Sequence, residues 1–205
     1  MKKQTLLTIG LATLLASATH ASQEQLARSI GDAHLEATRT SEQLKATLGA
    51  INALTKQTKG DLRPTYNAYC SEVAKTESAA TYTKTRSQWM ASDGRQYFKD
   101  WQNTVNGIAN ESLRKKSQKR LDAVQKSYDK VEASFQLAGE KFKPLLSDLG
   151  DIQKALAADV TPGGVKAIKS TVRSANWNHQ YVDKAINSAL KEMDKMEKAL
   201  SPEAK

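Results

Sequence analysis

The sequence predicts an all-α protein, an elongated antiparallel up-down-up-down four-helix bundle or coiled coil of long helices. Three observations support this prediction. Apolar residues recur at alternating steps of three and four through four segments of the chain, which places them on one face of each helix. The breaks between the segments are only a few residues long, and short connections make sequential helices pack antiparallel. Aromatic residues make up 6% and charged residues 26% of the 205 residues, which suits long helices better than a globule.

The first 21 residues are predicted to be a secretory signal peptide and not part of the fold. Lys2 and Lys3 give a basic start, an apolar run follows, and small residues before Ala18 and Ala21 offer two cleavage sites. Cleavage after Ala21 is favoured and would place the mature chain in the periplasm. It lowers the formal net charge from +9 to +7, because Lys2 and Lys3 are removed. A lipid anchor at the leader is not expected because no Cys stands at the cleavage site.

One helical bundle domain is expected over residues 22–200, followed by a tail at 201–205, and its first helix is predicted over 22–58. The apolar series of this helix is Leu26, Ile30, Ala33, Ala37, Thr40, Leu44, Thr47, Ile51 and Leu54. Gly60 then ends the helix, and Pro64 lies in the first turn of the next.

The second helix is predicted over residues 62–109. Its series weakens to Thr and Ser in the middle, and Gly94 would ordinarily indicate a turn. Because the apolar spacing continues across Gly94, we expect one long helix. The series is Leu62, Tyr66, Tyr69, Val73, Thr76, Ala80, Thr83, Ser87, Met90, Gly94, Tyr97, Trp101, Thr104 and Ile108.

The third helix is predicted over residues 112–158, with Asn110 or Ser112 as its cap. Its apolar series is Leu121, Val124, Tyr128, Val131, Phe135, Ala138, Phe142, Leu145, Leu149, Ile152 and Leu156. Pro144 lies inside the series and costs about 3 kcal/mol, because it removes a backbone donor and clashes with the preceding turn. Burying each apolar side chain gains about 1–3 kcal/mol, so the helix should bend and continue.

The fourth helix is predicted over residues 162–200, with Thr161 as its cap and Pro162 in its first turn. Its series is Val165, Ile168, Val172, Ala175, His179, Val182, Ile186, Ala189, Met193, Met196 and Leu200. Since no apolar stretch after the leader approaches about 18 residues, no membrane-spanning helix is expected.

No sequence motif for catalysis was found, so no enzyme activity, cofactor or metal site is expected. The chain has no Gly-x-Ser-x-Gly turn and no glycine-rich phosphate loop with a Lys. His179 occupies a position where an apolar residue is expected, so a metal or haem ligand is one reading, with Met193 and Met196 on the same face. The preferred reading is a partly exposed or hydrogen-bonded core His, because no Glu stands three residues before it, as di-iron bundles require.

Five cations gather at the start of the third helix and form a candidate surface for an anionic partner. They are Arg114, Lys115, Lys116, Lys119 and Arg120. Anionic lipid headgroups, lipopolysaccharide or an acidic polymer could bind there. The preferred reading is nevertheless a solvated face of mixed charge, because carboxylates occur at the same end of the predicted bundle. Nucleic acid is not expected, since no stacking aromatic residues are interleaved with these cations.

Cys70 is the only cysteine, so no disulfide within the chain is expected. It is either a buried small residue or the site of a disulfide that links a homodimer.

A further group of residues has a familiar order and spacing. The group comprises Phe98 to Trp101, Ile108 to Asn110, Leu113, Arg114, Ser117, Leu121, Tyr128, Pro144 to Leu149, and Ala167 with Ile168. Over roughly residues 62–197 it resembles the uncharacterised bacterial family called domain of unknown function 2959. The resemblance implies a secreted, all-helical, coiled-coil-rich protein of the cell envelope, with no established activity or site residues to transfer.

Three functions remain open on the sequence. The first is a non-enzymatic periplasmic bundle that binds or scaffolds an unknown envelope protein or an anionic envelope component. The second is a holdase-type chaperone, which the basic charge and the helical character would suit. The third is a cofactor-binding bundle that uses His179 as a ligand.

Overall fold

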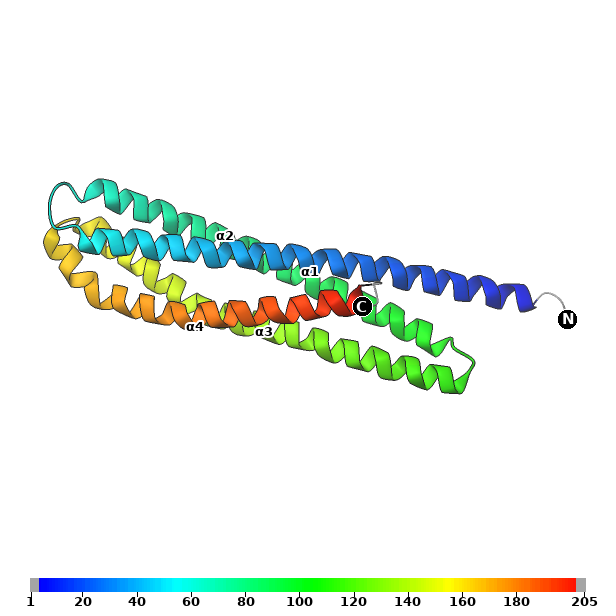
Figure 1. Cartoon of the computed structure of the whole chain (residues 1–205). Helices are drawn as coiled ribbons and strands as arrows, with labels where there is room; N and C mark the ends of the chain where they lie inside the picture. Colours follow the sequence, from blue (N-terminus) through cyan, green and yellow to red (C-terminus); the bar gives the residue numbers. More distant parts are fainter. Residues whose placement is uncertain (1–3, 202–205) are drawn as a thin grey trace. The chain divides into compact units, whose positions relative to one another are not determined.

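The computed structural model describes the backbone of residues 4–201 and the side chains of residues 18–201. Within this range the chain forms long helices joined by short connections (Figure 1), with no strand. The helices are α1 (Gln4–Lys56), α2 (Arg63–Asn106), α3 (Glu111–Ala158) and α4 (Pro162–Leu200). The predicted all-α bundle is confirmed. The helix boundaries agree with the predicted ones within a few residues, except that α1 begins inside the predicted leader. Residues 1–3 of that leader, and the side chains of its residues 4–17, lie outside the described part of the chain.

The packing contacts divide the chain into two compact units, and each contains a segment of all four helices. Unit 1 comprises Met1–His34, Arg86–Ala133 and Lys191–Lys205. Unit 2 comprises Leu35–Thr85 and Ser134–Leu190. Each unit is described by itself below.

The apolar series predicted from the sequence form the cores of both units. Every predicted position of α1 is buried, as is every predicted position of α3 except Phe135, which is half-buried. In α4 the single exception is His179. The series of α2 is less buried, although none of its members is exposed. Its half-buried members are Tyr66, Ala80, Thr83, Ser87, Trp101, Thr104 and Ile108. Burial of these faces against one another is therefore the main force that assembles each unit.

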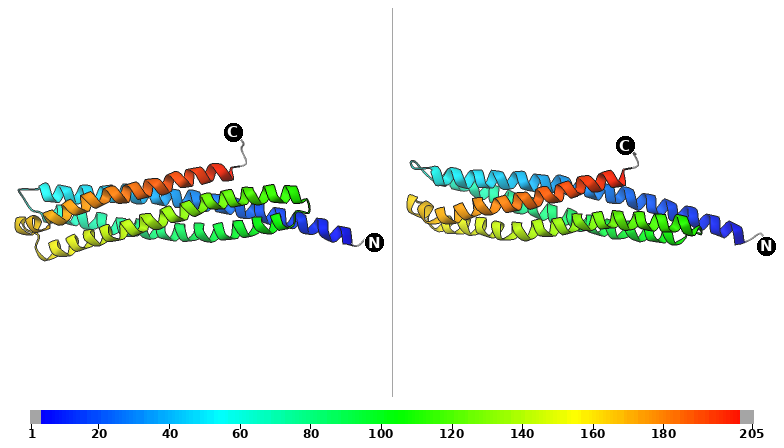
Figure 2. Two further views of the ribbon diagram at one scale, coloured as in Figure 1. Left: turned by 90° about the horizontal axis from the view of Figure 1, so that it is seen from below. Right: turned by 60° about the horizontal axis from the view of Figure 1, so that its bottom comes forward.

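Polar pairs fix the register of the helices in unit 2, and they show that neighbouring helices run antiparallel (Figure 2). Along each pair of helices, higher residue numbers on one helix meet lower numbers on the other. Between α1 and α2 the pairs are Thr40 with Thr83, at 2.9 Å, and Thr47 with Thr76, at 2.7 Å. Between α2 and α3, Tyr66 and Tyr69 donate to the carbonyls of Gln153 and Leu149. Between α1 and α4 the pairs are Ser41 with Asp183 and Asn52 with Asn176.

Unit 1 has the same antiparallel arrangement around an aromatic cluster. The rings of Tyr97 and Phe98 lie 5.1 Å apart, and Phe98 lies 5.4 Å from Tyr128. The Tyr128 hydroxyl donates to the Met90 carbonyl at 2.7 Å, joining α3 to α2. The helices α1 and α4 are joined by His34 with Asp194 and by Gln23 with the carbonyl of Leu200.

Both residues that threatened helix continuity lie inside unbroken helices. Pro144 is within α3 and is exposed, so its ring lies on the solvent side of the helix and not against the core. Gly94 is within α2 and is buried against the ring of Tyr128, where a Cβ atom would overlap the ring atom Cζ and the hydroxyl oxygen. Glycine at position 94 therefore allows a close approach of α3 and does not form a turn.

Helices α3 and α4 begin with the predicted side-chain caps. Asn110 caps α3 by accepting the Leu113 amide at 3.0 Å, and Thr161 caps α4 by accepting the Gly164 amide at 3.2 Å. These bonds satisfy backbone donors that a helix start otherwise leaves unpaired.

One side chain organises the connection between α1 and α2. The side-chain Nε2 of Gln57 donates to the carbonyls of Lys59 and Asp61, at 3.2 and 2.9 Å, and its Oε1 accepts a hydrogen bond from the Thr65 hydroxyl at 2.6 Å. Gly60 between them has a φ of 80°, a left-handed conformation that favours glycine.

No helical segment in the described part of the chain is apolar over a length that could cross a lipid bilayer.

We predict that Gly94→Ala destabilises the protein by about 1–2 kcal/mol. The methyl group must displace the packed Tyr128 ring, and overpacking of this kind costs about 1–3 kcal/mol, whereas alanine's helix propensity returns at most about 1 kcal/mol. Gly139→Ala is the matched control, because a Cβ atom there would meet no atom within 4 Å apart from its chain neighbours and the local backbone of its own helix. Urea unfolding measures both variants. Equal stabilisation of the two would contradict the close approach at Gly94.

Candidate functional site

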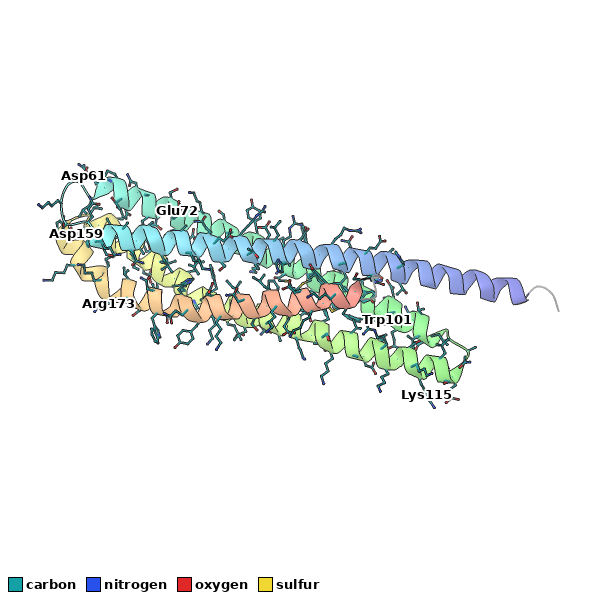
Figure 3. The ribbon with its side chains drawn as sticks, in the orientation of Figure 1. Asp61, Glu72, Trp101, Lys115, Asp159 and Arg173 are labelled. Carbon is teal, nitrogen blue, oxygen red and sulfur yellow. The ribbon has the colours of Figure 1, made fainter. Side chains whose placement is uncertain are left out.

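The five cations predicted as a patch all lie on the surface at the start of α3, where Figure 3 labels Lys115. Successive residues of a helix are rotated by about 100°. Lys115, Lys116 and Lys119 therefore share the side of α3 opposite its buried series. Arg114 stands seven residues before Leu121, on the line of the buried series but before its first buried member, and is exposed. Arg120 lies to one side of that series and donates to the Ala199 carbonyl at 3.3 Å. The patch is thus three lysines on one face of α3, and the two arginines do not belong to that face.

The surroundings of these lysines carry mixed charge. Lys115 pairs with Glu111 at 2.7 Å, and both side chains are largely exposed. Elsewhere in unit 1, a hydrogen bond from Lys195 lowers the pKa of Glu192, with smaller contributions from Lys130 and Lys191. Exposed pairs of this kind contribute at most about 1 kcal/mol. Lys116 and Lys119, like Arg114, form no ion pair with any residue that the structure describes, so these three cations of the predicted patch remain available to an anion.

His179 lies half-buried in unit 2, and its Nδ1 atom is buried without a hydrogen-bond partner. Burial lowers the pKa of His179, since the charged imidazolium loses its hydration; Asp183 opposes the shift and Lys45 adds to it. Met193 and Met196, the other candidate ligands, are core residues of unit 1. Among the described residues, no three His, Cys, Asp or Glu side chains are grouped closely enough to hold a metal ion.

The carboxylate next to His179 joins α4 to α1. Asp183 accepts the Ser41 hydroxyl at 3.0 Å and pairs with Lys45 at 3.3 Å. Asn187 also donates to it, at 3.1 Å. Burial raises the pKa of Asp183, but the bonds from Ser41 and Lys45 outweigh this effect and lower it. The carboxylate is therefore held ionised as a link between helices.

Two open grooves lie between α2 and α3, one in each unit. The groove in unit 2 is lined by Tyr66, Glu77, Lys143 and Ser147, among others. The groove in unit 1 is lined by residues that include Arg95, Lys99, Tyr128, Asp129 and Glu132. Burial raises the pKa of Glu132, and the charge of Arg95 opposes that shift. Each groove mixes charged and apolar side chains on an open surface.

Cys70 is half-buried, so it is not the fully buried small residue that was one of the two alternatives left open by the sequence. It lies beside Tyr66, where burial and a hydrogen bond with Cys70 raise the pKa of the Tyr66 hydroxyl to about 12. A disulfide between two chains through Cys70 stays a prediction.

Sequence reasoning missed the outer face of α4 in unit 2, which we define by the positions opposite the buried series. These are Lys166, Ser170, Arg173, Ser174, Trp177, Tyr181, Lys184 and Ser188. Trp177 and Tyr181 are 60% and 51% exposed, and their rings meet edge-on at 6.1 Å. The available signal was a second series at helical spacing that contains cations and aromatic residues and no carboxylate. It was overlooked because the cations are dispersed along the sequence and do not form a run.

We predict that His179 contributes a pH-dependent part of the stability. Because its pKa in the folded state lies below the unfolded value of 6.5, stability is fully present above that value and is lost as the pH falls toward the folded pKa. His179→Leu should flatten the dependence of the urea midpoint on pH just below 6.5. His34→Gln, the control, should keep the contribution of His179. An unchanged slope in the leucine variant would refute the prediction.

Comparison with known proteins gives one family. A search of curated proteins found no significant match. The family model described as "Protein of unknown function (DUF2959)" matches residues 16–200, which is nearly the whole chain and includes both the cationic start of α3 and the outer face of α4. The resemblance seen in the sequence is therefore confirmed, and the chain belongs to the DUF2959 family.

Proposed function

We propose that this chain is exported and acts in the periplasm as a non-enzymatic helical bundle that binds or scaffolds an anionic component of the cell envelope. Support for export comes from the sequence, in the basic start at Lys2 and Lys3 and the small residues that end at Ala21. Support for binding comes from the surface of the described residues.

The observation that carries this proposal is how the polar groups are distributed. Where two helices pack against each other, polar side chains form hydrogen bonds between the helices, as Thr47 does with Thr76 and Asn52 does with Asn176. Their role is to join helices. Cations on the outside, such as Lys116 and Lys119, have no ion-pair partner among the described residues. An excess of exposed positive charge attracts anionic surfaces and polymers.

A holdase-type chaperone is the second candidate, because several large apolar side chains are exposed among the cations. Leu113, at 53% exposure, directly precedes the cationic cluster of α3, and Leu137 is 47% exposed. Exposed apolar groups bind unfolded chains. Suppression of the aggregation of an unfolded outer-membrane protein by the purified chain would support this candidate, and failure to suppress it would exclude it.

We predict that the exported protein begins at Ser22. Small residues at positions −3 and −1 of the cleavage site are required for processing. Intact-mass measurement of protein recovered from the periplasm should therefore give the mass of residues 22–205. In Ala21→Asp the cleavage should fail or move to Ala18. Recovery of the whole unprocessed chain from the cytoplasm would refute export.

We also predict that binding to an isolated envelope fraction depends on salt and on the lysines of α3. Exposed electrostatic contacts weaken as salt screens them, so co-sedimentation should fall steeply between low and high ionic strength. Lys116→Glu combined with Lys119→Glu should weaken it severalfold. Lys154→Glu is the control, because Lys154 is already paired with Asp151 at 3.0 Å and lies in the other unit. The absence of any envelope binding at low salt would contradict the proposed function.

A further inference from the structure

We propose that the outer face of α4 in unit 2 is a docking surface for the headgroup region of an anionic phospholipid bilayer. This inference rests on the proposed envelope function and deepens it, because it names the ligand and places the contact on a surface other than the cationic start of α3.

The residues of this face form one continuous strip along α4. Lys166, Arg173, Trp177, Tyr181 and Lys184 follow one another at spacings of three, four or seven residues, which keeps them on the same side of a helix. The aromatic pair occupies the middle of the strip. Arg173 lies one turn before Trp177, and Lys184 lies one turn after Tyr181. Figure 3 shows Arg173 on the surface of α4. A continuous strip along one side of a helix can meet a lipid surface over several turns.

The charge on this part of α4 is almost entirely positive. Between Pro162 and Leu190 the sequence has four cations, Lys166, Lys169, Arg173 and Lys184, and a single carboxylate, Asp183. Asp183 does not belong to the outer face, because it bonds Ser41 and Lys45 of α1. All four cations are exposed. None of them forms an ion pair with a described residue.

Trp177 and Tyr181 distinguish this face from the lysines of α3. Both rings are more than half exposed, at 60% and 51%, although their apolar surfaces would be more stable away from water. Trp and Tyr carry an apolar ring with one polar group, and this combination favours the boundary between headgroups and acyl chains. Cations beside such rings reach anionic headgroups, and each Lys or Arg near an anionic bilayer strengthens binding by about fivefold.

The same features disfavour the other occupants of an exposed helix face. A second copy of the chain, related by twofold symmetry, would bring Arg173 and Lys184 against each other or against their own copies, and in either case like charges repel. A neutral polymer would gain nothing from four unpaired cations. An anionic polymer without an apolar layer would leave the exposed rings in water. A bilayer surface that contains anionic lipid satisfies both the charge and the aromatic pair.

Vesicle binding by the full chain tests the inference. The protein is recovered from the exported fraction, and co-sedimentation is measured with vesicles of phosphatidylcholine alone and of phosphatidylcholine mixed with phosphatidylglycerol. We expect binding only to the anionic vesicles. Arg173→Glu with Lys184→Glu should weaken it by more than about tenfold, because two attractive charges become repulsive. Trp177→Ser with Tyr181→Ser should weaken it at unchanged charge. Circular dichroism confirms that each variant is folded, and these exposed positions should tolerate the changes.

A matched charge reversal on unit 1 separates this face from general electrostatic attraction. Lys116→Glu with Lys119→Glu changes the net charge of the chain by the same amount as the reversal on α4. We expect it to weaken vesicle binding much less. Equal losses in the two double variants would overturn the assignment to α4. A leader that remained attached would be common to all variants and would not affect their comparison.

Tryptophan fluorescence gives a second, positional readout. Trp89→Phe with Trp101→Phe leaves Trp177 as the only tryptophan, whereas Trp101→Phe with Trp177→Phe leaves Trp89, which is also exposed, at 54%. With anionic vesicles that contain brominated lipid, the emission of Trp177 should shift to the blue and be quenched, and that of Trp89 should not. Quenching of Trp89 alone would refute the inference.

The outcomes also separate this inference from the proposed function. If the chain binds the isolated envelope fraction but not the anionic vesicles, the lipid-docking face is wrong and the proposed function stands. If it binds neither, both fail. If Trp177→Ser with Tyr181→Ser abolishes a concentration-dependent dimer and does not affect vesicle binding, the face is an interface between copies of the chain, and the inference is overturned.

Discussion

The structure depends on one constraint, which is that each helix carries an apolar face too long to remain in water. Burying one such side chain gains about 1–3 kcal/mol, and the buried residues continue along α1 from Leu26 to Leu54 and along α3 from Leu121 to Leu156. A helix with this pattern is stable only beside partners that cover it along the same length. Four helices connected by a few residues supply those partners within each unit. The same gain keeps α3 continuous at Pro144, where the backbone alone would favour a break.

Apolar burial alone does not fix how far one helix is displaced along another, because apolar contacts have little directional preference. The polar pairs supply that information. Sliding α1 along α2 in unit 2 would separate Thr47 from Thr76 and from the Glu72 carbonyl, and would leave Thr47 only its bond to the Gln43 carbonyl of its own helix. A buried hydroxyl that loses its partner costs about 1–3 kcal/mol. Asn52 with Asn176 and Ser41 with Asp183 impose the same condition between α1 and α4. In unit 1, the close contact of Gly94 with Tyr128 sets a steric limit with a similar effect.

Much of the fold could be predicted because its determinants are local in sequence. The buried faces, the caps at Asn110 and Thr161, and the continuity through Gly94 all follow from spacing within about one or two helical turns. Phe98 was missed as a core residue because the aromatic cluster of unit 1 uses two successive positions, which no single helical series contains. The bond between Ser41 and Asp183 joins residues 142 positions apart, so no local pattern reveals it. The candidate surface was predicted in part. The run of cations in α3 was evident, whereas the dispersed cations and rings of α4 become one surface only when the helix is formed.

The connection between α1 and α2 depends to an unusual degree on one carboxamide. The side-chain nitrogen of Gln57 donates to two backbone carbonyls, and its side-chain oxygen accepts a hydrogen bond from the Thr65 hydroxyl. Spontaneous deamidation would replace that donor by a carboxylate facing the same two carbonyl oxygens, and the resulting repulsion would open the segment around Lys59 to proteases. The chemical ageing of a single side chain would then weaken this connection, while the helices on either side retain their packing.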